Sequence, residues 1–127
     1  TLLWYRNKAS NRLDCVIECD FVPVGLIGLI GIDEVNRKAE FYISMGENAY
    51  KRKGISTIAT KLLINYAFSV LNLNKIYLNV DEENIAACKL YEKCGFRQEG
   101  RFEQDLWHRG RLINRLRYAI FAESFLS

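Results

Sequence analysis

The sequence predicts a single α/β domain with a mixed, mostly antiparallel central sheet flanked by helices. Its 127 residues are enough for one hydrophobic core and too few for two. Apolar residues make up 50% and charged residues 26% of the chain, as in ordinary globular domains. The apolar pattern has a strand-like period in the first half and near the end, and a helical period in the middle.

The first half of the chain is expected to form an antiparallel meander. Residues 2–10 are predicted as a short helix or the end of one. Three strand-like segments follow, separated by polar turns, at residues 13–19, 24–32 and 38–45. The second of these is almost continuously apolar and contains glycines, which favours a central strand closely approached by its neighbours.

The second half alternates helical and strand-like segments. Between Ile55 and Leu71 apolar residues recur every three or four positions, which indicates one face of an amphipathic helix. A short strand over residues 75–80 then completes a strand–helix–strand unit and favours a parallel pairing. A second helix is expected from the capping candidates at 81–84 to Cys94, and Gly95 suits its end. Residues 96–107 and 112–121 predict a long hairpin.

A basic, glycine-containing loop precedes the first long helix. Backbone N–H groups in the first turn of a helix have no partner inside it, and the helix dipole adds positive charge there. Such a loop is typical of phosphate binding, because glycine lets an anion approach the backbone closely. The candidate phosphate-binding residues are Lys51, Arg52, Lys53, Gly54, Ile55, Ser56 and Thr57.

Two segments resemble motifs of one enzyme superfamily. The run from Asn84 to Phe96 is similar to the N-x-x-A-x-x-L-Y-x-K-x-G-F signature of the GNAT N-acetyltransferases. Residues 51–56 resemble the family's pyrophosphate loop, with Lys51 and Ser56 at positions where the family has other residues. The tail around Gly100 and Gly110 resembles the branch that acetylates ribosomal-protein N-termini, polyamines and amino sugars. Family members usually carry a further strand and helix before the meander, so part of that region is expected to be missing.

The resemblance implies a GNAT-like fold that uses acetyl-CoA as cosubstrate. The loop amides would bind the pyrophosphate, and the pantetheine arm would pair with residues 43–45 where the two central strands splay apart. A backbone N–H of Ile43 or Ser44 would hold the thioester carbonyl, with Met45 continuing the same edge. Asn84 would hydrogen-bond the pantetheine arm; its alternative role is a helix N-cap.

The resemblance also suggests the acid and the base. Tyr91 is the candidate acid for the leaving thiolate, and its alternative is a half-buried aromatic side chain. In one branch of the family a glutamate five residues before the asparagine is the base, but Asn79 occupies that position here. Glu40, on the strand that leads into the splay, is the remaining candidate base, acting directly or through water. Its alternative is a solvated carboxylate.

Composition limits the other function classes. The net charge is only +3, so the arginine-rich hairpin at 101–117 predicts either a solvated surface or attraction to an anionic acceptor, and nucleic-acid binding is not expected. The cysteines lack C-x-x-C spacing and His108 is the single histidine, so we expect no metal site and reduced thiols in a cytoplasmic protein. No apolar run is long enough to span a membrane.

The sequence therefore predicts transfer of an acetyl group to a primary amine. The acceptor is expected to be a small molecule, an amino sugar or a protein N-terminus, and a homodimer is possible. The alternative is a CoA-binding module that has lost catalysis, which the asparagine at position 79 motivates.

Overall fold

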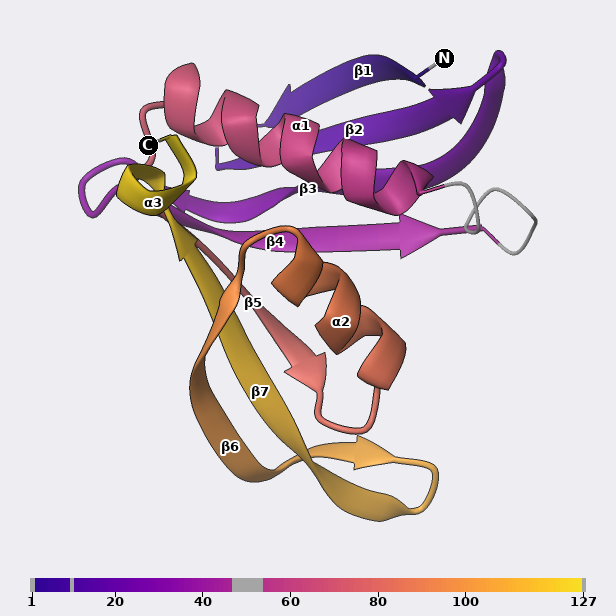
Figure 1. Ribbon diagram of the computed structural model, residues 1–127, viewed down its shortest axis with the longest axis vertical. Coiled ribbons are helices and arrows are strands. Elements are labelled where there is room, and N and C mark those ends of the chain that lie inside the picture. The colour runs from indigo at the N-terminus through magenta and orange to yellow at the C-terminus, as the bar shows by residue number, and fades with distance from the viewer. Residues whose placement is uncertain (1, 10, 47–53, 127) are drawn as a thin grey trace.

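The computed structural model describes residues 2–9, for which only the backbone path is given, and residues 11–46 and 54–126. The order of the elements matches the predicted alternation of strands and helices in the second half of the chain (Figure 1). The elements are β1 (Leu2–Ala9), β2 (Arg12–Cys19), β3 (Val22–Asp33), β4 (Lys38–Met45), α1 (Ile55–Ser69), β5 (Lys75–Asp81), α2 (Ile85–Lys93), β6 (Arg97–His108), β7 (Arg111–Phe121) and α3 (Ala122–Leu126).

The described strands form one seven-stranded sheet in the order β1-β2-β3-β4-β5-β7-β6. Every neighbouring pair is antiparallel except β4 and β5, which are parallel. The parallel pair is the one joined through helix α1, as expected for a crossover connection. The prediction of a mixed, mostly antiparallel sheet is confirmed.

The prediction of a helix at residues 2–10 is wrong. Residues 2–9 form the edge strand β1, which pairs with β2 from Leu2 opposite Cys19 to Ala9 opposite Arg12. A strand of this kind is specified by its neighbour more than by its own pattern, because pairing supplies the backbone hydrogen bonds.

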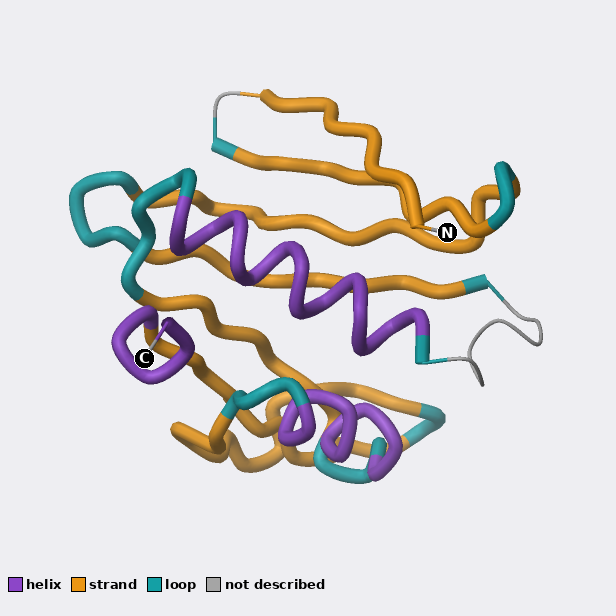
Figure 2. Tube along the Cα trace, turned by 45° about the horizontal axis from the view of Figure 1, so that its top comes forward, coloured by secondary structure: helices purple, strands orange, loops and turns teal. Residues whose placement is uncertain are grey.

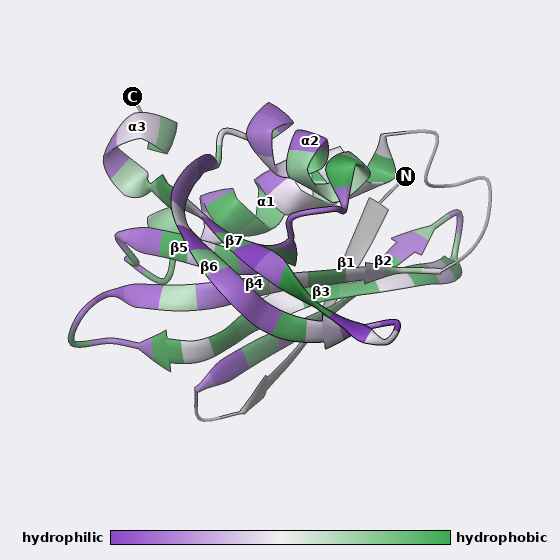
Figure 3. Cartoon of the chain, turned by 90° about the horizontal axis from the view of Figure 1, so that it is seen from below, coloured by the Kyte–Doolittle hydropathy of each residue, from purple (hydrophilic) through white to green (hydrophobic). Residues whose placement is uncertain are grey.

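The core lies between the sheet and the three described helices, which lie on one side of the sheet (Figure 3). Alternate residues of the strands point to this side and are buried, as the patterns of β2 and β5 show. Helix α1 packs along β3 and β4 (Figure 2). Its Ala59 and Leu63 meet the sheet's buried residues, such as Ile27 and Ile76, in a single apolar cluster.

The parallel pairing between β4 and β5 is short. It covers Lys38–Lys75, Ala39–Ile76 and Glu40–Tyr77. Beyond these residues β4 stays paired with β3 as far as Met45, and β5 stays paired with β7 as far as Asp81. The two strands diverge toward their carboxyl ends (Figure 1), so each has one edge without a neighbouring strand.

Candidate functional site

The described part of the predicted phosphate loop lies at the start of helix α1. Gly54 is the N-cap residue in a left-handed conformation, with φ of 73°, and no described side chain caps this end. Its carbonyl accepts a hydrogen bond from the Ile58 amide at 3.1 Å. Ile55 turns its side chain into the core, so only its amide can face a ligand, whereas Ser56 and Thr57 are half-buried. Lys51, Arg52 and Lys53 lie outside the described residues.

The predicted pantetheine-binding residues lie on the diverging part of β4. Ile43, Ser44 and Met45 pair with β3 on one edge only. In an extended strand, backbone polar groups point alternately to the two edges, so some of these groups face the edge that β5 has left. This edge can pair with an extended, amide-containing ligand.

Helix α2 carries the two candidate residues of the signature on one face. Asn84 is the N-cap, and its Oδ1 accepts a hydrogen bond from the Ala87 amide at 3.1 Å. The alternative role that the sequence left open is therefore present, and the Nδ2 group of Asn84 remains able to donate. Tyr91 follows two helical turns later.

The Tyr91 ring is held by other aromatic side chains. Its centroid lies 6.2 Å from that of Phe41, 5.8 Å from Phe96 and 6.4 Å from Tyr118. Burial, followed by Cys88 and Cys94, raises the pKa of Tyr91 above that of a free tyrosine. The phenol is therefore protonated at neutral pH and has a proton to donate. Phe41 belongs to β4, so this packing sets Tyr91 close to the diverging strand.

Glu40 lies on the other face of the sheet. Its neighbours Ala39 and Phe41 are buried on the helix side, so the alternation along β4 directs the half-buried Glu40 away from the helices. Glu40 is opposite Tyr77, which is the last position at which β4 and β5 pair. The candidate acid and the candidate base therefore approach β4 from opposite faces.

Asn79 has a structural partner. Its Oδ1 accepts a hydrogen bond from Arg117 Nε at 3.1 Å, and the Arg117 guanidinium lies 4.6 Å from the Tyr77 ring centroid. This amide oxygen thus orients a cation stacked on the aromatic ring beside Glu40. An amide cannot act as the general base at this position.

A polar contact that sequence reasoning missed crosses the same face. The hydroxyl of Tyr42 donates a hydrogen bond to Asp14, which also pairs with Arg12 at 2.8 Å. Gly28 separates the two strands, and a Cβ there would lie 2.6 Å from the Tyr42 ring. Burial, then the bond to Asp14, raises the pKa of Tyr42 to about 12. The glycine spacing in β3 was the available signal, since it indicated a close approach.

The arginines of the β6–β7 hairpin have partners within the protein. Arg101 pairs with Glu82 at 2.6 Å, Arg111 with Glu83 at 2.5 Å and Arg115 with Asp105 at 3.1 Å. Together with the stacked Arg117, these contacts engage much of the positive charge that was expected to attract an anionic acceptor. The hairpin instead contacts the turn that leads into α2.

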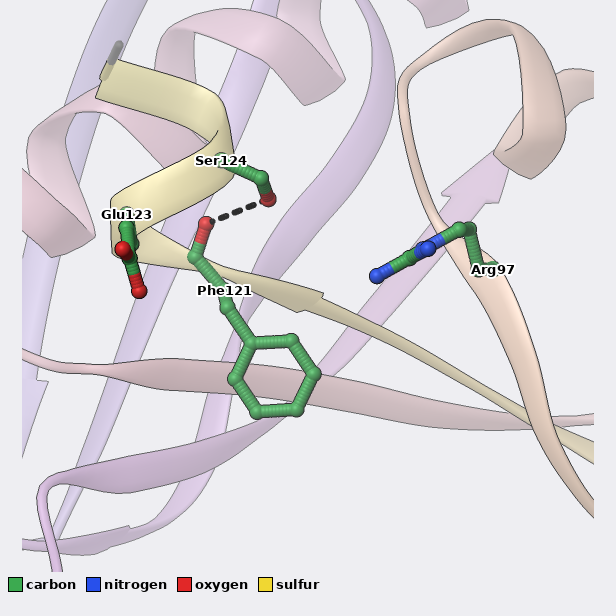
Figure 4. A pocket seen from close by; sticks show the side chains of 4 residues that line it. All are labelled: Arg97, Phe121, Glu123 and Ser124. Atoms are coloured by element: carbon green, nitrogen blue, oxygen red, sulfur yellow. Dashed lines mark hydrogen bonds between the residues drawn. The ribbon is translucent and has the colours of Figure 1, made fainter.

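A separate pocket of about 430 Å³ lies where β7 runs into α3 (Figure 4). It is lined by Arg97, Phe121, Glu123 and Ser124, and the Ser124 hydroxyl donates to the Phe121 carbonyl at 3.1 Å. None of the predicted site residues lines it. Among the described residues, no three histidine, cysteine or acidic side chains are grouped as metal ligands, and no helix is long and apolar enough to cross a bilayer.

Comparison with known proteins agrees with this geometry. Residues 2–97 match the model of the acetyltransferase (GNAT) domain. The chain belongs to the GNAT family.

Relatives of this GNAT chain include named polyamine and ribosomal acetyltransferases. Spermidine N(1)-acetyltransferase of Escherichia coli strain K12 is 42% identical over 112 residues, which cover 88% of this chain and 60% of that protein. A putative ribosomal N-acetyltransferase of Bacillus subtilis is 33% identical over 108 residues, covering 84% and 58%. The dodecameric structure of spermidine N-acetyltransferase from Vibrio cholerae superposes with a TM-score of 0.87 at 34% identity, covering 93% and 69%.

This GNAT chain is shorter than those relatives. It spans about 60% of the length of the Escherichia coli protein. The matched part contains the diverging strands, the start of α1 and helix α2, which are the elements that carry the predicted coenzyme site.

Proposed function

We propose that this chain is an acetyl-CoA-dependent N-acetyltransferase for primary amines. The observation that carries the proposal is the divergence of β4 and β5 after Glu40 and Tyr77, with Tyr91 on one face of β4 and Glu40 on the other. A thioester placed at this edge has a proton donor on one side and a carboxylate on the other.

The coenzyme side of the proposal uses the helix face. The first turn of α1, from residue 55 onward, contains no acidic residue to compete with a phosphate for its amides. The pantetheine arm pairs with the free edge of β4 at residues 43–45, and Asn84 Nδ2 donates to it. A backbone N–H of Ile43 or Ser44 stabilises the negative charge that develops on the thioester oxygen.

The reaction is a direct attack of the neutral amine on the thioester carbonyl carbon. A primary alkylammonium, with a pKa of about 10.4, first loses a proton to the solvent to give the neutral amine. The nitrogen loses a second proton as the amide forms, and Glu40 accepts this proton directly or through a water molecule. The carbon–sulfur bond breaks as the carbon–nitrogen bond forms. The leaving thiolate takes its proton from the Tyr91 hydroxyl, which burial keeps protonated.

Polyamines are the acceptor class that we favour, and protein N-termini are the second. Relatives that are named as spermidine acetyltransferases match 88% and 82% of this chain. On the face away from the helices, the half-buried Glu40 supplies a carboxylate that suits an ammonium-bearing acceptor.

The experiment is an acetylation assay read by mass spectrometry. The protein is incubated with acetyl-CoA and, separately, with spermidine, glucosamine and a peptide with a free N-terminus. The proposal expects an acetylated product, with spermidine the fastest substrate. Calorimetric binding of acetyl-CoA without any acetylated amine would instead support the alternative of a CoA-binding module.

The base assignment has its own comparison. Glu40→Gln should lower kcat while leaving acetyl-CoA affinity unchanged, because the carboxylate faces the acceptor side. Glu34→Gln is the control, since Glu34 lies exposed in the turn between β3 and β4. Equal activity of Glu40→Gln and the control would remove Glu40 from the mechanism.

Self-association and a cytoplasmic location complete the proposal. The spermidine N-acetyltransferase of Vibrio cholerae has a dodecameric structure, and we propose that this chain also self-associates. Size-exclusion chromatography tests this. The four cysteines are buried and none forms a disulfide, which fits a reducing compartment.

A further inference from the structure

The turn between β5 and α2 is tied to the β6–β7 hairpin through one carboxylate. Glu82 accepts hydrogen bonds from Arg101 Nε at 2.6 Å, from Arg101 Nη2 at 3.4 Å and from Asn114 Nδ2 at 3.0 Å. Its own backbone N–H donates to the Asn114 carbonyl at 3.1 Å. Glu82 therefore contacts both strands of the hairpin with its side chain and main chain.

The same turn sets the start of helix α2. The Asn84 amide donates to the Asp81 carbonyl at 3.0 Å, and the Glu83 amide donates to the Asp81 carboxylate at 2.7 Å. Asn84 then caps the helix. Glu82 lies within this turn, between Asp81 and Asn84, so its tie to the hairpin acts on the segment that places Asn84 and the helix carrying Tyr91.

Helix α2 contacts the core mainly through the partly buried Ala87, Leu90 and Tyr91, and ties at its two ends add to this packing. Cys88 is the only fully buried residue within the helix. Toward its other end, the Tyr118 hydroxyl of β7 donates to Glu92 Oε2 at 2.8 Å. Two carboxylates, Glu82 before the helix and Glu92 within it, thereby attach both ends of α2 to β6 and β7.

We propose that Glu82, held by Arg101 and Asn114, is a positioning residue that places Asn84 and Tyr91 for the coenzyme. The inference rests on the proposed acetyl transfer, in which both residues touch acetyl-CoA. Glu82 itself does not contact the reacting atoms. Small displacements of reacting groups are costly to rate, so a loosened α2 reduces turnover without unfolding the domain.

The chain contains a matched control for this contact. Arg115 and Asp105 form an ion pair of similar exposure within the hairpin, at 3.1 Å. Arg115 lies opposite Asp81 in the β5–β7 pairing, but its side-chain ion pair is with Asp105 and not with Glu82. Exposed ion pairs contribute little to global stability, so all of these variants are expected to remain folded. Comparing variants of the two ion pairs therefore separates the effect of placing α2 from the effect of removing a surface charge.

The experiment compares Glu82→Gln, Arg101→Gln, the double variant, and the control pair Asp105→Asn and Arg115→Gln. We expect Glu82→Gln and Arg101→Gln each to lower kcat/KM for acetyl-CoA by roughly tenfold, with a raised KM for acetyl-CoA. The double variant should have the same kcat/KM as either single variant, because the Glu82–Arg101 contact is lost in all three. The control variants should stay within about twofold of the parent protein.

Hydrogen exchange separates this inference from the proposed function. The amides of Ala87 and Cys88 should exchange faster in Glu82→Gln than in the parent protein and the control variants. Faster exchange in a protein that transfers no acetyl group would support the tie and refute the function. Unchanged exchange and unchanged kcat/KM in an active protein, or additive losses in the double variant, would overturn the positioning role.

Discussion

Glu40 and Tyr77 form the last residue pair at which β4 and β5 are side by side. Beyond them β4 stays paired with β3 and β5 stays paired with β7, but β4 and β5 no longer pair with each other. The sheet therefore splits locally between β4 and β5 while both halves keep their hydrogen bonds. The relationship matters because an unpaired strand edge is a template for another extended chain. Here it lies between a helix mouth and the aromatic cluster of Tyr91.

The first prediction concerns Gly54 at the start of α1. A valine at this left-handed position is strained, and the strain is relieved by moving the first-turn amides. Gly54→Val should weaken acetyl-CoA binding by roughly tenfold, measured by calorimetry. Gly110→Val is the matched control, because Gly110 is also left-handed with open space around its α-carbon and lies at the hairpin tip. Equal loss of affinity in both variants would refute a phosphate site at α1.

The second prediction concerns Tyr91. Tyr91→Phe keeps the ring in its aromatic cluster and removes only the hydroxyl, so folding and acetyl-CoA affinity should not change. Turnover should fall by about a hundredfold, the usual scale for loss of general acid catalysis. Steady-state kinetics with a direct measurement of acetyl-CoA affinity checks both parts. Undiminished turnover would show that the thiolate is protonated by another group.

The third prediction concerns stability at alkaline pH. Burial, followed by the hydrogen bond to Glu92, raises the pKa of the Tyr118 hydroxyl in the folded state. Above about pH 10 the unfolded chain loses this proton while the folded protein keeps it, so stability falls as pH rises. Between about pH 9 and 11 the free energy of unfolding should decline less steeply in Tyr118→Phe, by up to about 1.4 kcal/mol per pH unit. Urea denaturation at each pH measures this free energy in both proteins. An equally steep decline with pH in Tyr118→Phe and the parent protein would contradict the prediction.

The fourth prediction concerns the close approach at Gly28. A Cβ there would meet the Leu13 carbonyl at 2.1 Å and the Tyr42 ring at 2.6 Å. Gly28→Ala should therefore destabilise the protein by about 2–4 kcal/mol and disrupt the Tyr42–Asp14 bond. Gly100→Ala is the control, because its nearest neighbour would be 4.0 Å away. Chemical denaturation measures both, and similar stabilities of the two variants would argue against the tight packing.

Local patterns predicted much of this fold for a physical reason. The helical period of residues 55–71 comes from burying one face on the sheet, and α1 ends close to the predicted limit, at Ser69. The glycine at 95 does adopt a positive φ after α2, as a helix terminator should. In the meander, β2 alternates buried and half-buried residues, whereas β3 was recognisable from its nearly continuous apolar run.

The missed features depend on distant parts of the chain. β1 is a strand because β2 pairs with it, and the five-residue α3 is held by contacts such as that of Phe125 with Phe68, whose centroids are 5.7 Å apart. Glu82 stood out in the sequence only as a possible helix cap. Its contact with Arg101 joins residues that are far apart in sequence, and no local pattern reveals it.

The most direct test of the central claim is a titration of the ¹⁵N-labelled protein with acetyl-CoA followed by NMR. The account predicts that the largest shifts fall on the amides of Ile43, Ser44 and Met45 and on those of Ser56 and Thr57. Saturating shifts confined to other strands, or none at all in the folded protein, would contradict coenzyme binding where β4 and β5 diverge.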